Sequence, residues 1–180
     1  LWWNANTISH NFIHRPFFRS HRLNRIYSAY LTLLLGVPQH LWRSRHLSHH
    51  AGVRHRLRLT KPLLQETGLV IAFWSILAIW TPREFATIYL PDWLIGLTLC
   101  QLHGYFEHAY GTRSYYGRLY NLLFFNDGFH VEHHRRPADH WTMHAAETRA
   151  DARPSRWPPI LRWLDARGML TVLELMALRS

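Results

Sequence analysis

The chain has 180 residues, of which 48% are hydrophobic, so it is large and apolar enough to form a folded domain rather than a disordered or fibrous protein. A single cysteine, Cys100, excludes an internal disulfide framework and a zinc finger. The net charge of +10 at pH 7 alone would fit a nucleic-acid-binding protein, but no zinc-finger, basic-zipper or RRM motif accompanies it. Nucleic acid is therefore not an expected partner.

The first predicted element is a helix over residues 1–15, which Pro16 ends. Its motif HNFIH places His10 and His14 four residues apart. Residues at this spacing lie on one face of a helix, with Cβ atoms about 5–6 Å apart, so both rings can reach one metal ion. Because the opening LWWNANTISH reads as the end of an apolar helix that leads directly into this motif, we expect the chain to be truncated at its N-terminus.

An apolar segment follows at 26–37, and Pro38 ends it. A helix of this length rises only about 18 Å, which is too short to cross a bilayer core of roughly 30 Å. The segment is therefore predicted to be re-entrant or interfacial. A buried helix of a soluble protein is the alternative.

A polar helix is predicted from Gln39 to about His55, with the motif HLSHH on one side. His40 and His55 are expected at its surface or behind the ligands. The basic flank on both sides of the motif is typical of the cytoplasmic side of a membrane protein, where anionic lipid headgroups attract it. Docking of an acidic electron carrier is the alternative. The arginines of this flank are Arg43, Arg45, Arg54, Arg56 and Arg58.

The most hydrophobic part of the chain, residues 68–80, is apolar all round and is the best candidate for a membrane span. It is shorter than the usual minimum of about 17 residues, so we expect it either to extend into 63–67 or to stay partly buried by protein. A turn at 81–84 and a second apolar segment then bring the chain back. The result is a predicted membrane hairpin at about 66–108, with a soluble all-α bundle as the alternative.

The returning segment carries His103 and His108, which project differently around a helix and need not share a metal. After a helix or tight turn, the motif HVEHH forms a third histidine cluster. For the following His140 and His144, a supporting or surface role is favoured over a further pair of ligands. The two regions expected are residues 1–145 and a C-terminal helical tail at 146–180, amphipathic and broken near Gly168.

Three clusters among 15 histidines favour a metal site over scattered core or surface histidines. The zinc-protease pattern HExxH is absent. Imidazole suits iron, copper, nickel and zinc, so the spacing alone does not name the metal. Carboxylates commonly hold the second ring nitrogen of a ligating histidine. The candidates for that role are Glu107, Asp127, Glu132 and Asp139.

The order of the motifs, with the hairpin between the second and the third, resembles the membrane fatty acid desaturase superfamily. The phrase NDGFHVEHHRRP at 126–137 is especially similar to that family's third histidine box. The resemblance covers about residues 1–140 and implies an all-α, multi-pass membrane protein with a cytoplasmic, histidine-rich di-iron cap. It implies no catalytic residues beyond the metal ligands, which carry over to His10, His14, His46, His49, His50, His108, His130, His133 and His134.

The resemblance further implies an oxidoreductase that introduces a double bond into a fatty acyl chain, using O2 and external electrons. The sequence contains no dinucleotide, flavin or haem-attachment motif, so a ferredoxin or cytochrome b5-type protein is the expected donor. The segment YFEHAYG also resembles the alkane-hydroxylase branch. Hydroxylation of an alkane, lipid or carotenoid therefore stays open, and a non-catalytic, histidine-rich metal-binding membrane protein is the alternative from a different class.

Overall fold

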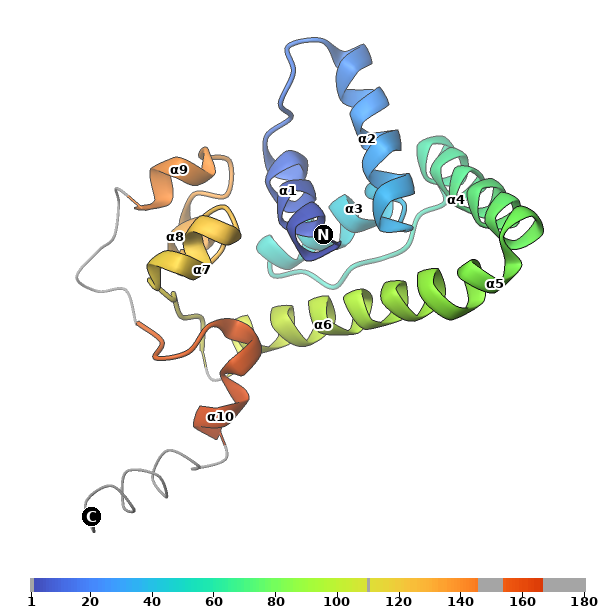
Figure 1. Ribbon diagram of the computed structural model, residues 1–180. Coiled ribbons are helices and arrows are strands. Elements are labelled where there is room, and N and C mark those ends of the chain that lie inside the picture. Colours follow the sequence, from blue (N-terminus) through green and yellow to red (C-terminus); the bar gives the residue numbers. More distant parts are fainter. Residues whose placement is uncertain (1, 110, 146–153, 167–180) are drawn as a thin grey trace, which may run out of the picture. The chain divides into compact units, whose positions relative to one another are not determined.

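The computed structural model describes residues 2–109, 111–145 and 154–166. Over these residues the regular structure is helical, apart from one isolated β-bridge between Ser114 and Pro154, which confirms the predicted all-α class (Figure 1). The contacts divide the chain into two compact units, which we call unit 1 (Leu1–Leu97) and unit 2 (Thr98–Ser180). Each unit is described by itself.

Unit 1 contains α1 (Trp2–His14), α2 (His21–Leu35), α3 (Gln39–His50), α4 (Lys61–Trp80), α5 (Pro82–Glu84), the π-helical turn η1 (Phe85–Tyr89) and the start of α6 (Leu90–His108). Unit 2 contains the rest of α6, α7 (Arg118–Leu123), α8 (His130–Arg135), α9 (Trp141–His144), the 3-10 helix η3 (Pro159–Leu161) and α10 (Trp163–Ala166).

The core of unit 1 forms where α1, α2 and α3 pack on one another and α4 packs on α2 and α3. Each fully buried aliphatic or aromatic side chain stabilises this packing by about 1.5–3 kcal/mol. A buried polar contact lies beside them: the Ser9 hydroxyl donates to the Gln39 side-chain oxygen, which ties α1 to the start of α3. In the described part of unit 1 the buried apolar side chains are Ala5, Phe12, Ile13, Leu31, Leu35, Leu63 and Val70.

Two helix boundaries in unit 1 differ from the prediction. The segment expected at 26–37 is the later part of a longer helix, because Ser20 caps α2 by accepting the Leu23 N–H at 3.4 Å. Conversely, α3 ends at His50 and not near His55. Gly52 takes up a left-handed conformation (φ +63°) there, and its N–H donates to the His49 carbonyl.

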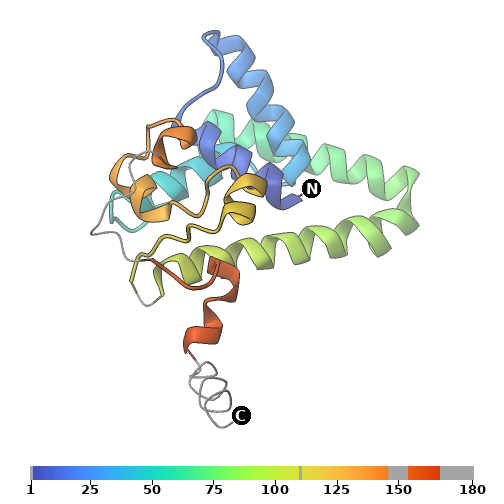
Figure 2. The same ribbon diagram turned by 60° about the vertical axis from the view of Figure 1, so that its left-hand side comes forward.

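Helix α4 runs over 20 residues, so it extends through 63–67 as predicted and begins earlier still, at Lys61. Thr60 caps its first turn by accepting the Leu63 N–H at 3.4 Å. After Trp80 the chain reverses (Figure 2), and Trp74 of α4 donates its indole N–H to the Tyr89 hydroxyl at 3.0 Å. By length and composition, two helical stretches could cross a membrane: Lys61–Trp80 and Pro82–His108.

The loop before α8 in unit 2 is held by the side chain of Asn121. Its amide nitrogen donates to the carbonyls of Tyr115 (2.9 Å) and Gly117 (3.1 Å), and its oxygen accepts the Gly128 N–H at 3.0 Å. Phe125 and Asn126 both adopt positive φ, of 50° and 60°. This tight turn therefore sets where α8 begins and where its histidines project.

The expected division into residues 1–145 and a tail at 146–180 stays a prediction. The break expected near Gly168 lies outside the described residues. The described part of the tail, residues 154–166, packs within unit 2, where the Ser155 N–H donates to the Ser114 carbonyl at 2.7 Å.

Candidate metal centre

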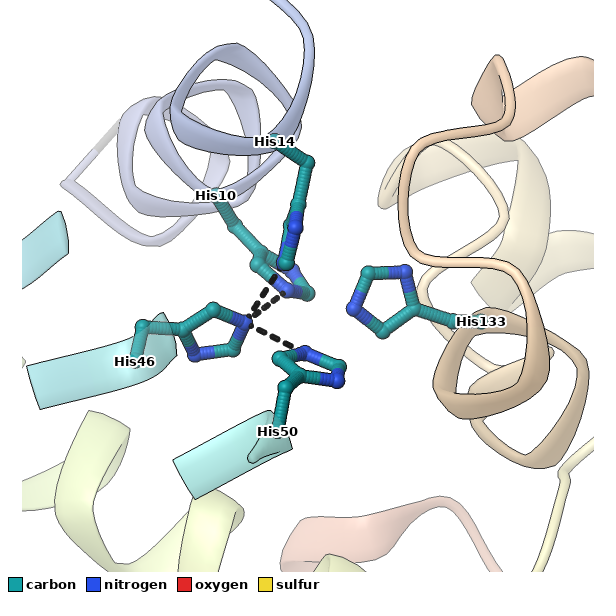
Figure 3. A group of neighbouring side chains, drawn as sticks. All are labelled: His10, His14, His46, His50 and His133. Carbon is teal, nitrogen blue, oxygen red and sulfur yellow. Dashed lines mark hydrogen bonds between the residues drawn. The ribbon is translucent and has the colours of Figure 1, made fainter. Parts of the chain in front are cut away.

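Four imidazoles from α1 and α3 converge in unit 1 (Figure 3). The Nε2 atom of His46 lies 2.9 Å from His10 Nε2, 2.8 Å from His14 Nε2 and 2.8 Å from His50 Nε2. A neutral imidazole Nε2 carries either one hydrogen or one lone pair, so it can form one good hydrogen bond. Three such neighbours exceed that capacity, and a shared cation that accepts all the lone pairs accounts for the arrangement.

The spacing of these nitrogen atoms suits a transition metal. Metal–nitrogen bonds to histidine are about 2.0–2.1 Å long, so two ligands at a right angle on one ion have nitrogen atoms about 3 Å apart. The separations around His46 Nε2 are 2.8–2.9 Å. The group can therefore bind a metal ion, as predicted, although this geometry does not select iron over zinc or copper.

The convergence follows from two equal spacings on two contacting helices. His10 and His14 are four residues apart on α1, and His46 and His50 are four residues apart on α3. The buried Ser9–Gln39 hydrogen bond and the bond from Arg43 Nε to the Ile13 carbonyl (3.4 Å) fix α1 against α3. Both pairs therefore face the same point.

The electrostatic environment keeps His46 neutral. Burial, followed by the neighbouring imidazoles, of which His10 and His14 contribute most, lowers the pKa of His46. The neutral imidazole is the form that binds metal. His49 differs from the other predicted ligands of unit 1: its side chain is exposed, and its ring centroid lies 6.1 Å from that of His46.

A second histidine group lies in unit 2, between the end of α6 and α8. His108 Nε2 lies 3.0 Å from His130 Nε2, and the ring of His134 lies 4.8 Å and 4.6 Å from these two rings, measured between centroids. His133 projects differently: its ring centroid lies 6.2 Å from that of His130 and 5.6 Å from that of the buried His144.

Glu107, one of the candidate carboxylates, lies on the outer side of this group, whereas Asp127 contacts His103. Glu107 Oε1 lies 3.1 Å from His130 Nδ1, and because a carboxylate only accepts, the ring must donate there. That tautomer leaves His130 Nε2 free of a proton and able to bind a metal. His103 Nε2 lies between the two carboxylates, 3.2 Å from Glu107 and 3.0 Å from Asp127, consistent with a role apart from His108.

Glu132 anchors α8 from the other side. It is buried and accepts hydrogen bonds from the Ser114 hydroxyl (2.5 Å) and the Tyr116 hydroxyl (2.7 Å). Burial and the bond to this carboxylate raise the pKa of Tyr116 to about 12, so its hydroxyl stays protonated and donates. Asp139, the fourth candidate carboxylate, forms an exposed ion pair with Arg136 at 3.8 Å instead.

Three further histidines, His40, His55 and His140, make local contacts outside the two histidine groups. The Nε2 atom of His55 lies 3.1 Å from the Ser44 hydroxyl, and His140 caps α9 by accepting the Thr142 N–H at 3.4 Å. Sequence reasoning left His40 without a specific partner and missed Glu66. These two residues contact each other at 2.7 Å, and Glu66 is buried.

No protein-family model, curated protein or solved structure matches the chain. The evidence for a function therefore comes from the geometry of the histidine groups. Each unit contains histidine side chains that can bind a metal ion.

Proposed function

We propose that this chain is a membrane-bound di-iron oxidoreductase of the fatty acid desaturase superfamily, which introduces a double bond into a fatty acyl chain. The observation that carries the proposal is the convergence of imidazole nitrogens on His46 Nε2, at 2.8–2.9 Å, from two of the three histidine motifs. These motifs occur in the order and with the intervening hairpin that the resemblance requires.

In this proposal each unit supplies ligands for one iron ion. His10, His14, His46 and His50 would hold the ion of unit 1. His108 and His130, with the adjacent ring of His134, would hold that of unit 2. His49 and His133 complete the ligand set that the resemblance implies. When bound, the iron pair supplies the oxidising power, with O2, to remove hydrogen from an unactivated C–H bond.

The chain's own groups would prepare this site in three ways. Glu107 accepts a hydrogen bond from the Nδ1–H of His130 and so keeps Nε2 directed at the metal position. Burial keeps His46 neutral and ready to bind. Glu132, held by two hydroxyls, fixes the helix that carries the third motif. All three effects keep the ligands in place before a metal arrives.

A membrane location is supported by the apolar side chains of α4. Ile71, Ile76, Ile79 and Trp80 are all more than half exposed, at 61%, 55%, 75% and 81%. Such a surface is costly in water and favourable in lipid. We propose that α4 and the stretch Pro82–His108 both span the bilayer, with the histidine motifs on the cytoplasmic side. The arginines after the second motif would face anionic lipid headgroups there.

An apolar cavity of about 640 Å³ in unit 1 offers room for part of an acyl chain. This volume lies within the range of about 300–1,000 Å³ typical of small-molecule sites. Ile8, which lines the cavity, and His10 lie on the same helix. The other lining residues include Trp2, Tyr30, Leu34, Leu77 and Phe85. A lipid or fatty acyl substrate is therefore the proposed ligand, and electrons would come from a ferredoxin or cytochrome b5-type partner.

The proposal is tested by expressing the chain in a host with a defined lipid composition and analysing its fatty acids by mass spectrometry. A new double bond that disappears with His46→Ala and persists with His55→Ala would support it. A new hydroxyl group would identify the hydroxylase alternative. Unchanged lipids from a folded, iron-loaded protein with an added electron donor would contradict it and favour the non-catalytic metal-binding alternative.

A further inference from the structure

We propose that Arg162 is a positioning residue for the metal ligands of unit 2, acting from the C-terminal segment on the last turn of α6. The proposal rests on the metal-binding part of the proposed function. It assigns a role to the segment 154–166, for which the sequence predicts only part of an amphipathic helical tail.

The guanidinium of Arg162 is buried, with only 2% of the residue exposed. Its Nη1 donates to the carbonyl of Glu107 at 3.1 Å and its Nη2 donates to the carbonyl of Gly111, also at 3.1 Å. The residue is itself held by a hydrogen bond from its own N–H to the Pro159 carbonyl at 3.0 Å. The side chain thus bridges two carbonyls that flank His108.

Burying a charged group costs several kcal/mol unless hydrogen bonds and opposite charge compensate. The end of a helix provides both, because its last four carbonyls lack partners within the helix and carry a partial negative charge. Arginine suits this position because its planar fork presents parallel N–H groups to two acceptors, whereas lysine is a point charge. The contact therefore depends on the shape of the side chain as well as on its charge.

The bridged turn lies at the end of α6 and determines the position of His108 in the unit 2 histidine group. The Gly111 N–H donates to the His108 carbonyl at 3.0 Å, and Gly111 adopts a φ of +87°. Glu107 is the residue before His108, and its carboxylate contacts the Nδ1 atom of His130. Fixing the carbonyls of Glu107 and Gly111 therefore fixes the direction from which His108 approaches His130 Nε2, 3.0 Å away.

The same segment also contacts the other side of the group. Ser155 N–H donates to the Ser114 carbonyl, and the Ser114 hydroxyl donates to Glu132 on α8. The segment 154–166 therefore reaches both the helix end that carries His108 and, through Ser114, the helix that carries His130.

Cobalt(II) titration of the full chain tests the proposal, because the visible spectrum of cobalt reports the number and geometry of its ligands. All measurements use a His46→Ala background, which disables the unit 1 group. We expect Arg162→Gln to weaken cobalt binding roughly 10- to 100-fold, the usual effect of losing a group that holds a metal ligand, and to change the spectrum. Arg162→Lys should bind with intermediate affinity and an altered spectrum. Arg118→Gln, an exposed arginine of the same unit, is the control and should change neither.

The unfolding midpoint of each variant is measured in parallel. An Arg162→Gln protein that is less stable but binds cobalt with unchanged affinity and spectrum would overturn the positioning role and leave the proposed function intact. If Arg162→Gln does not fold, the lysine variant decides by the same two readouts. Absence of cobalt binding in the folded His46→Ala parent would overturn the unit 2 site and the role of Arg162 together.

Discussion

The carboxylate of Glu66, in the first half of α4, accepts two hydrogen bonds from His40 at the start of α3. Its Oε2 accepts the backbone N–H of His40 at 2.8 Å, and its Oε1 accepts the ring Nδ1–H at 2.7 Å. The Ser28 hydroxyl donates to the same Oε1 at 2.9 Å. Because α3 also carries His46 and His50, this contact joins a candidate membrane helix to the helix that carries two candidate metal ligands.

Replacing Glu66 by glutamine should therefore destabilise unit 1. An amide places its N–H2 group where one carboxylate oxygen now accepts, so the buried residue 66 loses at least one of its hydrogen bonds, at a cost of about 1–3 kcal/mol. Denaturant unfolding of the detergent-solubilised protein measures the change in the free energy of unfolding. Glu84→Gln, at an exposed carboxylate, is the control, and equal effects of the two substitutions would contradict the account.

The lowered pKa of His46 predicts how the metal-free protein responds to acid. Burial and then the adjacent imidazoles lower this pKa in the folded state, whereas an unfolded histidine titrates near 6.5. The unfolded chain therefore binds the proton more readily, and the free energy of unfolding falls as the pH drops below about 6.5, by up to about 1.4 kcal/mol per pH unit. Equilibrium unfolding of chelator-treated protein should show this fall, and His46→Gln should reduce it. An identical pH dependence in both proteins would contradict the prediction.

A charged substitution on α4 distinguishes a lipid environment of this helix from an aqueous one. Ile71 is 61% exposed, so Ile71→Arg would be nearly neutral on a surface in water. In the middle of a membrane span it should cost about 2.5–3.5 kcal/mol and reduce insertion. Alkaline extraction of membranes measures the inserted fraction. Leu57→Arg, at a residue 62% exposed in the loop before α4, is the control, and equal insertion of both variants would contradict the span.

The turn before α8 should not tolerate a side chain at Gly128. A Cβ atom there would lie 2.2 Å from the Tyr115 carbonyl oxygen, which belongs to the backbone and cannot rotate away. We expect Gly128→Ala to lower both the stability and the metal affinity of unit 2. Gly104→Ala, where a Cβ meets nothing within 4 Å, should be neutral or stabilising by up to about 1 kcal/mol. Thermal unfolding and cobalt titration distinguish the two.

Much of the metal-binding arrangement is predictable because it depends on local geometry. Four-residue spacing on a helix forces His10 with His14, and His46 with His50, onto common faces whatever the rest of the chain does. The overall helical class and the approximate extent of α4 follow similarly from apolar composition and proline positions. Such features are encoded within one element and are visible in the sequence.

The supporting contacts are not predictable in the same way, because their partners lie far apart in the chain. Glu66 was identifiable only as the sole acidic residue of α4, which indicates a partner without naming His40. Arg162 donates hydrogen bonds to the carbonyls of Glu107 and Gly111, and no periodic pattern in the sequence distinguishes this arginine from the others. The early end of α3 depends on the left-handed conformation of Gly52. This boundary was predictable in principle, because a glycine often follows the last residue of a helix.

The metal content of the detergent-purified full chain tests the central claim most directly. We predict about two iron ions per chain in the unmodified protein and about one in each of His46→Ala and His130→Ala, because each substitution removes a ligand from one group only. His55→Ala should retain both ions. A folded chain that contains no iron, or that binds zinc in amounts unaffected by either ligand substitution, would contradict the account.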